Sequence, residues 1–258
     1  MNRRNTGFAL AMFLLLVAAA TWPSHAPQAW AGPKKLSASD AARQTKPKAA
    51  APAPASVIVS DKGKFRILLD GQPVGSEEFE ISPAGNDWQA HGSTEIRAPG
   101  AGTVHARATL KLASDGTPIR YEWSVQAQKK TSAVVEFQNG QAKIAAQLGG
   151  SEPFLQMFSF ASPRVIILDN NIYHHYAVLA RIYDWNAKGA QTFPVLIPQG
   201  PVPGTITVEA LGPQEVEGAR LEMLRVQTPD IEVNLYLDSG HRLIRLAVPA
   251  SRVAVVRE

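Results

Sequence analysis

Two adjacent histidines, His174 and His175, form the densest group of proton-binding side chains in the sequence, and Asp169 lies shortly before them. A histidine oriented by a carboxylate can act as a general base, so His175 with Asp169 is the candidate pair for hydrolysis. Neighbouring side chains on a helix point about 100° apart, whereas metal-binding helices place two histidines four residues apart. The pair therefore indicates no metal site, and no nucleotide- or cofactor-binding motif accompanies it.

The helical phase predicts different surroundings for the two histidines. His175 falls at the edge of the apolar face and is expected to point inward. There it is a structural residue, a ligand contact or a catalytic base. His174 falls on the polar side with Arg181 and Asp184, and Asp169 or Asn170 is expected to cap the start of the helix.

Other charged and polar groups are expected in solvent. Three glutamates follow a turn and are interpreted as a solvated strand face that protects a sheet edge: Glu77, Glu78 and Glu80. Three histidines have the outward phase of their strands or turns: His91, His105 and His241. Neither group indicates chemistry.

Aromatic side chains suggest a second function, the binding of an apolar molecule. Tyr121 and Trp123 share one face of a predicted strand, and three residues of the helix follow its apolar face. The predicted ligand-binding residues are Tyr121, Trp123, His175, Tyr176, Leu179 and Tyr183. The alternative interpretation is that these side chains fill an ordinary core.

Alternating apolar and polar residues predict antiparallel strands through most of the chain after residue 55. Glycine follows Asp, Asn or Ser between several of these runs, as tight hairpins require. About ten strands are expected from the candidates 56–60, 64–70, 74–82, 87–97, 103–113, 117–128, 131–138, 141–148, 204–211, 217–227, 231–238, 241–248 and 251–257. Sequential strands joined by hairpins pair with one another, so a meander is expected.

Residues 171–187 break this pattern with helical periodicity, and apolar residues cover most of the circumference. A helix this apolar is expected to be buried. The predicted fold class is therefore mainly β: a long antiparallel meander curled into a half-barrel or open barrel around one central helix. A short strand is expected within 163–168, and the proline-rich residues 193–204 are expected to form a rim or lid instead of an interior strand.

The N-terminal region is expected to be an export signal followed by a linker. Residues 8–20 form an apolar run behind Arg3 and Arg4, shorter than the about 20 residues that span a membrane and typical of a signal peptide. Ala-Trp-Ala at 29–31 predicts cleavage there. The expected organisation is a signal peptide at 1–31, a disordered Ala/Pro/Lys-rich linker at 32–55 and a single β domain at 56–258, in a periplasmic or secreted protein without a transmembrane span.

Composition excludes several classes of protein. The chain has no cysteine, which excludes disulfides, thiolate metal sites, iron–sulfur clusters and a bacterial lipoprotein anchor. Residues 1–55 hold seven Lys and Arg residues against one Asp, so the overall net charge of +4 comes from this region and the rest is slightly acidic. Nucleic-acid binding needs cations clustered on the folded domain, and is therefore not expected.

Two segments resemble a group of uncharacterised exported bacterial β-sheet proteins. One runs from Phe65 to Phe79 in the pattern F-x-I-x-x-D-G-x-x-V-G-x-E-x-F, and the other joins Ile167–Asn171 to Tyr-His-His-Tyr at 173–176. A curved sheet that surrounds a helix is also similar, at a distance, to the periplasmic lipoprotein-carrier half-barrels. Neither resemblance implies catalytic residues, and a shared fold does not determine function.

Three functions remain open. The first is a non-catalytic envelope protein that binds a lipid or acyl chain between the sheet and the helix. The second is an envelope assembly module with a filled core and an exposed strand edge or apolar patch that binds a protein partner. The third is a hydrolase that uses His175 with Asp169 in a cleft.

Overall fold

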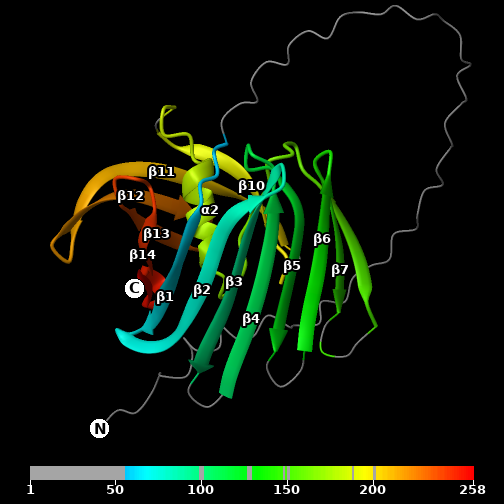
Figure 1. Cartoon of the computed structure of the whole chain (residues 1–258), viewed down its shortest axis with the longest axis horizontal. Coiled ribbons are helices and arrows are strands. Elements are labelled where there is room, and N and C mark those ends of the chain that lie inside the picture. Colours follow the sequence, from blue (N-terminus) through cyan, green and yellow to red (C-terminus); the bar gives the residue numbers. More distant parts are fainter. Residues whose placement is uncertain are drawn as a thin grey trace, which may run out of the picture.

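The computed structural model describes residues 56–98, 102–126, 130–147, 149, 152–187, 189–199 and 202–258. The expected signal peptide and linker lie outside these residues. Fifteen strands form one continuous sheet in the order β8-β7-β6-β5-β4-β3-β2-β1-β15-β14-β13-β12-β11-β10-β9. The predicted mainly β fold with a curved, open sheet and one helix is confirmed (Figure 1).

The sheet consists of two meanders that meet at its centre. The first contains β1 (Asp61–Leu69), β2 (Gln72–Ala84), β3 (Asp87–Ala98), β4 (Gly102–Leu112), β5 (Pro118–Gln126), β6 (Lys130–Gln138), β7 (Gln141–Gln147) and β8 (Phe154–Ser159). The second contains β9 (Ile166–Ile167), β10 (Gln191–Ile197), β11 (Val202–Val216), β12 (Ala219–Gln227), β13 (Glu232–Leu237), β14 (Leu243–Val248) and β15 (Val253–Arg257). They join where β1 pairs antiparallel with β15, with Phe65 opposite Arg257.

The chain itself forces this sheet to curl. Its two edge strands are β8 and β9, yet only residues 160–165 separate them in the sequence. Such a connection spans at most about 25 Å, far less than the width of fifteen strands spaced about 4.8 Å apart. The edges therefore approach each other, and the inward faces of the strands enclose a common core.

Helix α2 (His174–Ile182) lies on the concave side of this sheet (Figure 1). It contacts β3 of one meander and β14 of the other, so it packs between the two halves. The helix is shorter than the expected 171–187. Asn171 has a positive φ of 63° and Asp169 forms a bridge with Ile172, so the chain turns before the helix begins. At the other end, the helix stops at Tyr183, whose backbone is no longer helical.

The proline-rich segment is a pair of strands, and the expectation of a rim or lid was wrong. β10 pairs antiparallel with β11 along seven residues, with Pro194 opposite Thr205. β9 pairs in parallel with β10, but reaches only Val195 and Leu196. Pro194 therefore lies beyond the end of β9, where a missing N–H breaks no ladder bond to that strand.

Two further differences concern strands. The candidate at 56–60 is irregular, although Ile58 is buried, and the short β8 was not expected. Most other candidates coincide with observed strands within a few residues. Within the described residues, no helix has the length and apolar character needed to cross a membrane.

Candidate functional site

A buried carboxylate holds the start of the helix. Glu77 of β2 is fully buried, and its Oε2 accepts hydrogen bonds from the backbone N–H groups of Tyr173 (2.9 Å) and His174 (3.1 Å). Its Oε1 lies 2.7 Å from Nδ1 of His174, whose side chain is also fully buried. Two unpaired donors of the first helical turn are thus satisfied from a strand nearly a hundred residues away in the sequence. The negative charge also faces the positive end of the helix dipole.

The expectation that Glu77 and His174 face solvent was wrong. Along β2, Glu77 has the same phase as Phe79 and Ile81, and all three are buried. The alternation of β2 therefore indicated that Glu77 points inward. Its charge and its acidic neighbours suggested instead a strand face exposed to solvent. Glu78 and Glu80 are indeed paired on the outside, with Lys64 and Lys62 respectively.

A glycine provides the space for this contact. Gly92 of β3 lies under the imidazole of His174. A Cβ atom at Gly92 would lie 2.5 Å from Nδ1 of His174 and 3.0 Å from Oε1 of Glu77. Both neighbours are buried and cannot swing away, so any larger residue at Gly92 would displace the helix or break the hydrogen bond.

Asp169 makes a second buried polar contact and does not cap the helix as expected. Its Oδ2 accepts a hydrogen bond from the hydroxyl of Tyr121 (2.9 Å), and its Oδ1 accepts one from the backbone N–H of Gln199 (3.1 Å). Burial raises the pKa of the Asp169 carboxyl to about 8, although these hydrogen bonds act in the opposite direction. Burial, together with the Asp169 and Glu77 charges, raises the pKa of Tyr121 well above its ordinary value. The contact ties β5 to the segment that follows β9 and to the segment that follows β10.

His175 lies between these two contacts but joins neither. Its ring packs in T-shaped arrangements with the rings of His174 and Tyr121, at centroid distances of 4.7 and 5.2 Å. Neither ring nitrogen has a hydrogen-bond partner in the described part of the chain, and both oxygens of Asp169 are engaged elsewhere. Burial and the neighbouring His174 hold the pKa of His175 well below its usual range. This geometry favours a neutral imidazole in the core over a base oriented by Asp169.

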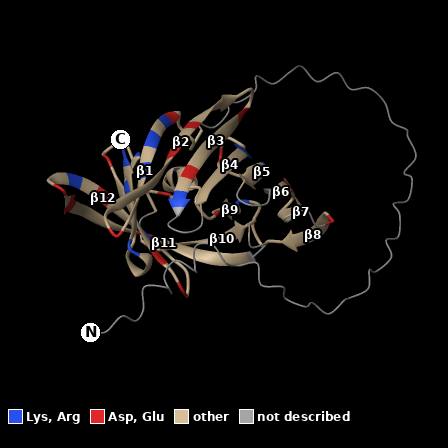
Figure 2. Ribbon diagram, turned by 90° about the horizontal axis from the view of Figure 1, so that it is seen from below, with Lys and Arg blue, Asp and Glu red and all other residues tan. Residues whose placement is uncertain are grey.

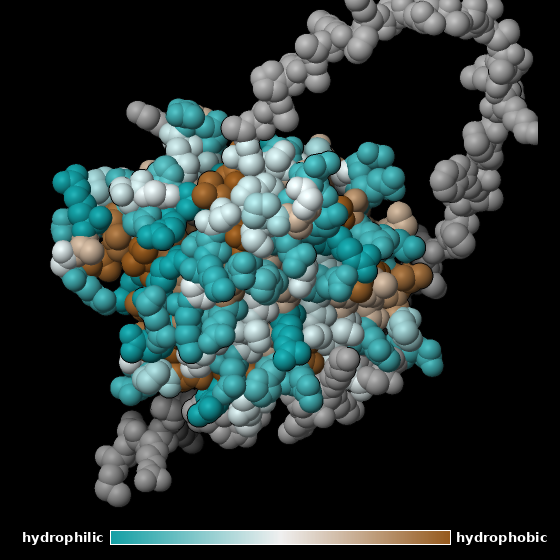
Figure 3. All heavy atoms as spheres, in the orientation of Figure 1, coloured by the Kyte–Doolittle hydropathy of each residue, from teal (hydrophilic) through white to brown (hydrophobic). Residues whose placement is uncertain are grey.

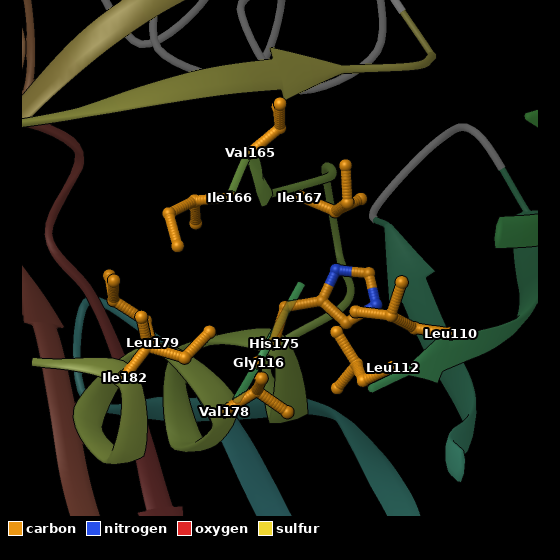
Figure 4. A pocket seen from close by; sticks show the side chains of 10 residues that line it. All are labelled: Leu110, Leu112, Gly116, Val165, Ile166, Ile167, His175, Val178, Leu179 and Ile182. Atoms are coloured by element: carbon orange, nitrogen blue, oxygen red, sulfur yellow. The ribbon is translucent and has the colours of Figure 1, made fainter. Parts of the chain in front are cut away.

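A small cavity lies against the inner side of the helix (Figure 4). Figure 4 shows the His175 ring pointing from the helix into this space, with Ile166 and Ile167 on the opposite side. Its volume of about 10 Å³ is roughly what one water molecule requires. The lining residues are Leu110, Leu112, Gly116, Val165, Ile166, Ile167, His175, Val178, Leu179 and Ile182.

The six predicted ligand-binding residues are dispersed around this space. His175 and Leu179 line the cavity, and Tyr121 contacts His175 from the side. Tyr183 lies past the helix, where its hydroxyl donates to the carbonyl of Gly189 and accepts from the N–H of Ala210. The other two lie outside the cavity lining: Trp123 is buried and Tyr176 is partly buried.

The remaining histidines lie nearer the surface. His91 and His105 are exposed, as expected. His241 is only partly exposed because its ring stacks on Trp185 at a centroid distance of 3.8 Å. The described residues contain no cluster of three or more His, Asp or Glu side chains suited to a metal ion.

A second candidate site is strand β8, at one end of the sheet. Among the described residues, β8 has one neighbouring strand, β7. Among the large apolar residues that the structure describes, Leu155 and Met157 on β8 are the most exposed, at 68% and 62%. Figure 2 shows this end of the sheet almost free of charged residues, whereas β1, β2 and β12 carry many. Hydrophobic atoms also gather at the side of the molecule where β7 and β8 lie (Figure 3).

The fold and this site define a mainly β, barrel-like protein with a polar contact buried in its core. A solved structure of this kind is the beta-barrel-like protein of a domain of unknown function, DUF1849, from Brucella abortus. It superimposes with a TM-score of 0.54 and 8% sequence identity, over 79% of this chain and 97% of that one. No family model and no curated protein matches the sequence. The similarity therefore concerns the fold alone.

Proposed function

We propose that the protein is an exported, non-catalytic interaction module of the cell envelope, which binds an extended segment of a protein along strand β8. The observation that carries this proposal is the open edge of β8 with Leu155 and Met157 on its outer face. Natural proteins usually protect such edges with charged residues, bulges or coverings, because an open edge pairs with other chains. The sequence of β8, FLQMFS, contains no charge.

The backbone of β8 supports strand addition. The N–H of Phe160 donates to the carbonyl of Gly140 (2.7 Å), and this bond continues the β7–β8 register. By alternation, the N–H and C=O groups of even-numbered residues in β8 point toward β7. Those of Leu155, Met157 and Ser159 therefore point away from the sheet, available to an added strand.

The interior supports a non-catalytic role. Asp169 and His175, the candidate hydrolytic pair, are both buried and do not hydrogen-bond to each other. A hydrolytic site needs a general base that can reach substrate and water.

In-cell photo-crosslinking tests this proposal. A photoreactive amino acid at Met157 of the full chain should give discrete cross-linked products. The same substitution at Arg107, exposed in the middle of the sheet on β4, serves as the control. Crosslinking at Met157 that does not exceed the Arg107 background would overturn the proposal.

A second candidate function is the binding of a lipid or acyl chain, as the sequence suggested. The cavity beside Leu179 favours it, because its lining is almost entirely apolar. An acyl chain would need the helix to move outward, since the present space is about that of one water molecule. Native mass spectrometry of the purified chain with lipid extraction distinguishes the two functions: co-purifying lipid favours a carrier, and a ligand-free mass argues against one.

A further inference from the structure

We propose that the partner of β8 is β8 of a second copy of this chain, paired antiparallel about a twofold axis at Gln156. This inference rests on the proposed function and specifies its partner. Its basis is the symmetry of the strand: Phe154 and Phe158 flank Gln156 at one spacing, and Leu155 and Met157 flank it at another. A twofold interface requires such a self-complementary surface.

The pairing follows from the backbone directions. With Gln156 opposite its own copy, Leu155 lies opposite Met157 of the second copy. Both of these residues direct their N–H and C=O groups away from β7, so the two chains exchange hydrogen bonds at these positions. Gln156 directs its own groups toward β7 and becomes a non-hydrogen-bonded pair with its copy.

The side chains favour the same register. On the outer face, Leu155 and Met157 of both copies form one apolar cluster of four side chains, which shields their exposed surface. On the inner face, Phe154 meets Phe158. Shifting the register by two residues in one direction places Met157 opposite Pro153, which has no N–H, and in the other direction places Leu155 opposite Ser159. The absence of charge means that two identical strands can approach without repulsion.

Single cysteines test the register, because the chain has no cysteine of its own. In a non-hydrogen-bonded pair the Cα atoms lie about 4.5 Å apart, within the range of a disulfide. The variant Gln156→Cys of the full chain should therefore form a disulfide-linked dimer of twice the chain mass on a non-reducing gel. Leu155→Cys and the control Arg107→Cys should remain monomeric under the same oxidation. Residue 155 lies opposite Met157 of the second copy and two residues out of register with its own equivalent, and Arg107 lies on β4, away from the pairing edge.

Sedimentation of the unmodified full chain tests the dimer without any cysteine. A concentration-dependent shift from one to two chain masses is expected, and Met157→Lys should abolish it by placing a charge in the apolar cluster. A chain that stays monomeric at every concentration, or Gln156→Cys that oxidises no faster than Arg107→Cys, overturns this inference. If photo-crosslinking at Met157 then identifies a different protein, the proposed function stands and only the second copy is excluded.

Discussion

At the scale of single residues, Glu77 is a buried polar group that holds the start of the helix. It satisfies two backbone donors of the helix and the ring of His174 at once. Glu77→Gln keeps the shape but places an amide N–H₂ among donors and removes the charge at the helix N-terminus. We expect the free energy of unfolding to fall by about 2 kcal/mol, measured by urea denaturation.

A matched control lies on the next position of the same strand. Glu78 is exposed and pairs with Lys64 at 3.3 Å, an arrangement that contributes little in water. Glu78→Gln should change the free energy of unfolding by less than about 0.5 kcal/mol. Equal losses of unfolding free energy in the two variants would show that the buried contact of Glu77 stabilises the protein no more than the exposed pair of Glu78.

Asp169 should make stability depend on pH. Its pKa is about 8 in the folded protein and about 3.9 in an unfolded chain. Since the folded state retains the proton, the stabilising contribution is complete below about pH 4 and is lost as the pH rises toward 8. The free energy of unfolding changes by at most about 1.4 kcal/mol per pH unit through this one group. Asp169→Asn removes this loss because an amide does not titrate, and the amide can still bond to Tyr121 and Gln199.

Urea denaturation at pH 4.5, 6 and 8 measures this effect. The difference in unfolding free energy between Asp169→Asn and the unmodified chain should move in favour of the variant as the pH rises. His175 contributes the opposite trend, since its lowered pKa means that stability is lost as the pH falls below about 6.5. That contribution is common to both proteins and cancels in the difference. A difference that stays constant with pH would contradict the assignment.

Residue phase was a better guide than residue type in this core. The alternation of β2 places Glu77 inward with Phe79, but a lone carboxylate is rarely buried, so charge alone predicted the wrong side. Asp169 fits a helix cap by type, yet its bonds go to Tyr121 and Gln199, which are distant in the sequence. Contacts of this kind depend on the completed fold and cannot be read from local pattern.

At the scale of elements, local sequence patterns were enough to predict most strands. They were not enough to predict the elements that depart from the regular pattern. Period-two alternation and glycine-containing turns predicted most strands close to their observed limits. β10 was missed because proline is rare in interior strands, whereas here the flanking strand β9 is only two residues long. The helix was predicted too long because periodicity continues past its ends, while the positive φ of Asn171 ends it on one side.

The fit between β3 and the helix gives a prediction at this scale. Gly92→Ala should lower the free energy of unfolding by about 2 kcal/mol, because its methyl group would overlap His174 and Glu77. Gly204→Ala on β11 is the control, since a Cβ atom there meets Val195 at an ordinary 3.5 Å. Thermal unfolding of both variants measures the effect. If Gly92→Ala proved as stable as Gly204→Ala, the close packing of helix against sheet would be in doubt.

At the scale of the whole molecule, the sequence predicted a curled sheet around a buried helix but not how the sheet is joined. Hairpins predict which sequential strands pair. The pairing of β1 with β15 links residues almost two hundred positions apart, and no local pattern specifies it. The order of the fifteen strands in the sheet therefore follows from the structure and not from the sequence pattern.

Arg257 of β15 secures this junction. Its guanidinium bonds to the carboxylate of Asp61 and to the carbonyls of Lys62 (3.0 Å) and Leu243 (3.1 Å). It also lies over the rings of Phe65 and Phe79, at 5.8 and 5.3 Å from their centroids. The Arg257 side chain is 11% exposed and that of Asp61 4%, so solvent screens the pair little. The junction thus combines charge, hydrogen bonding and aromatic packing in one side chain.

Arg257→Met keeps the apolar stem of this side chain and leaves Asp61 buried without its partner. We expect the free energy of unfolding to fall by about 3 kcal/mol, because removing one member of a buried pair leaves an uncompensated charge. Arg66→Met, which removes an exposed arginine 3.8 Å from Glu258 at the same junction, should cost less than about 1 kcal/mol. Adding Asp61→Asn to Arg257→Met should recover part of the lost unfolding free energy, since the buried, unpaired carboxylate is then removed. Additive losses in that double variant would mean that the two meanders are joined by the β1–β15 ladder alone, without help from the ion pair.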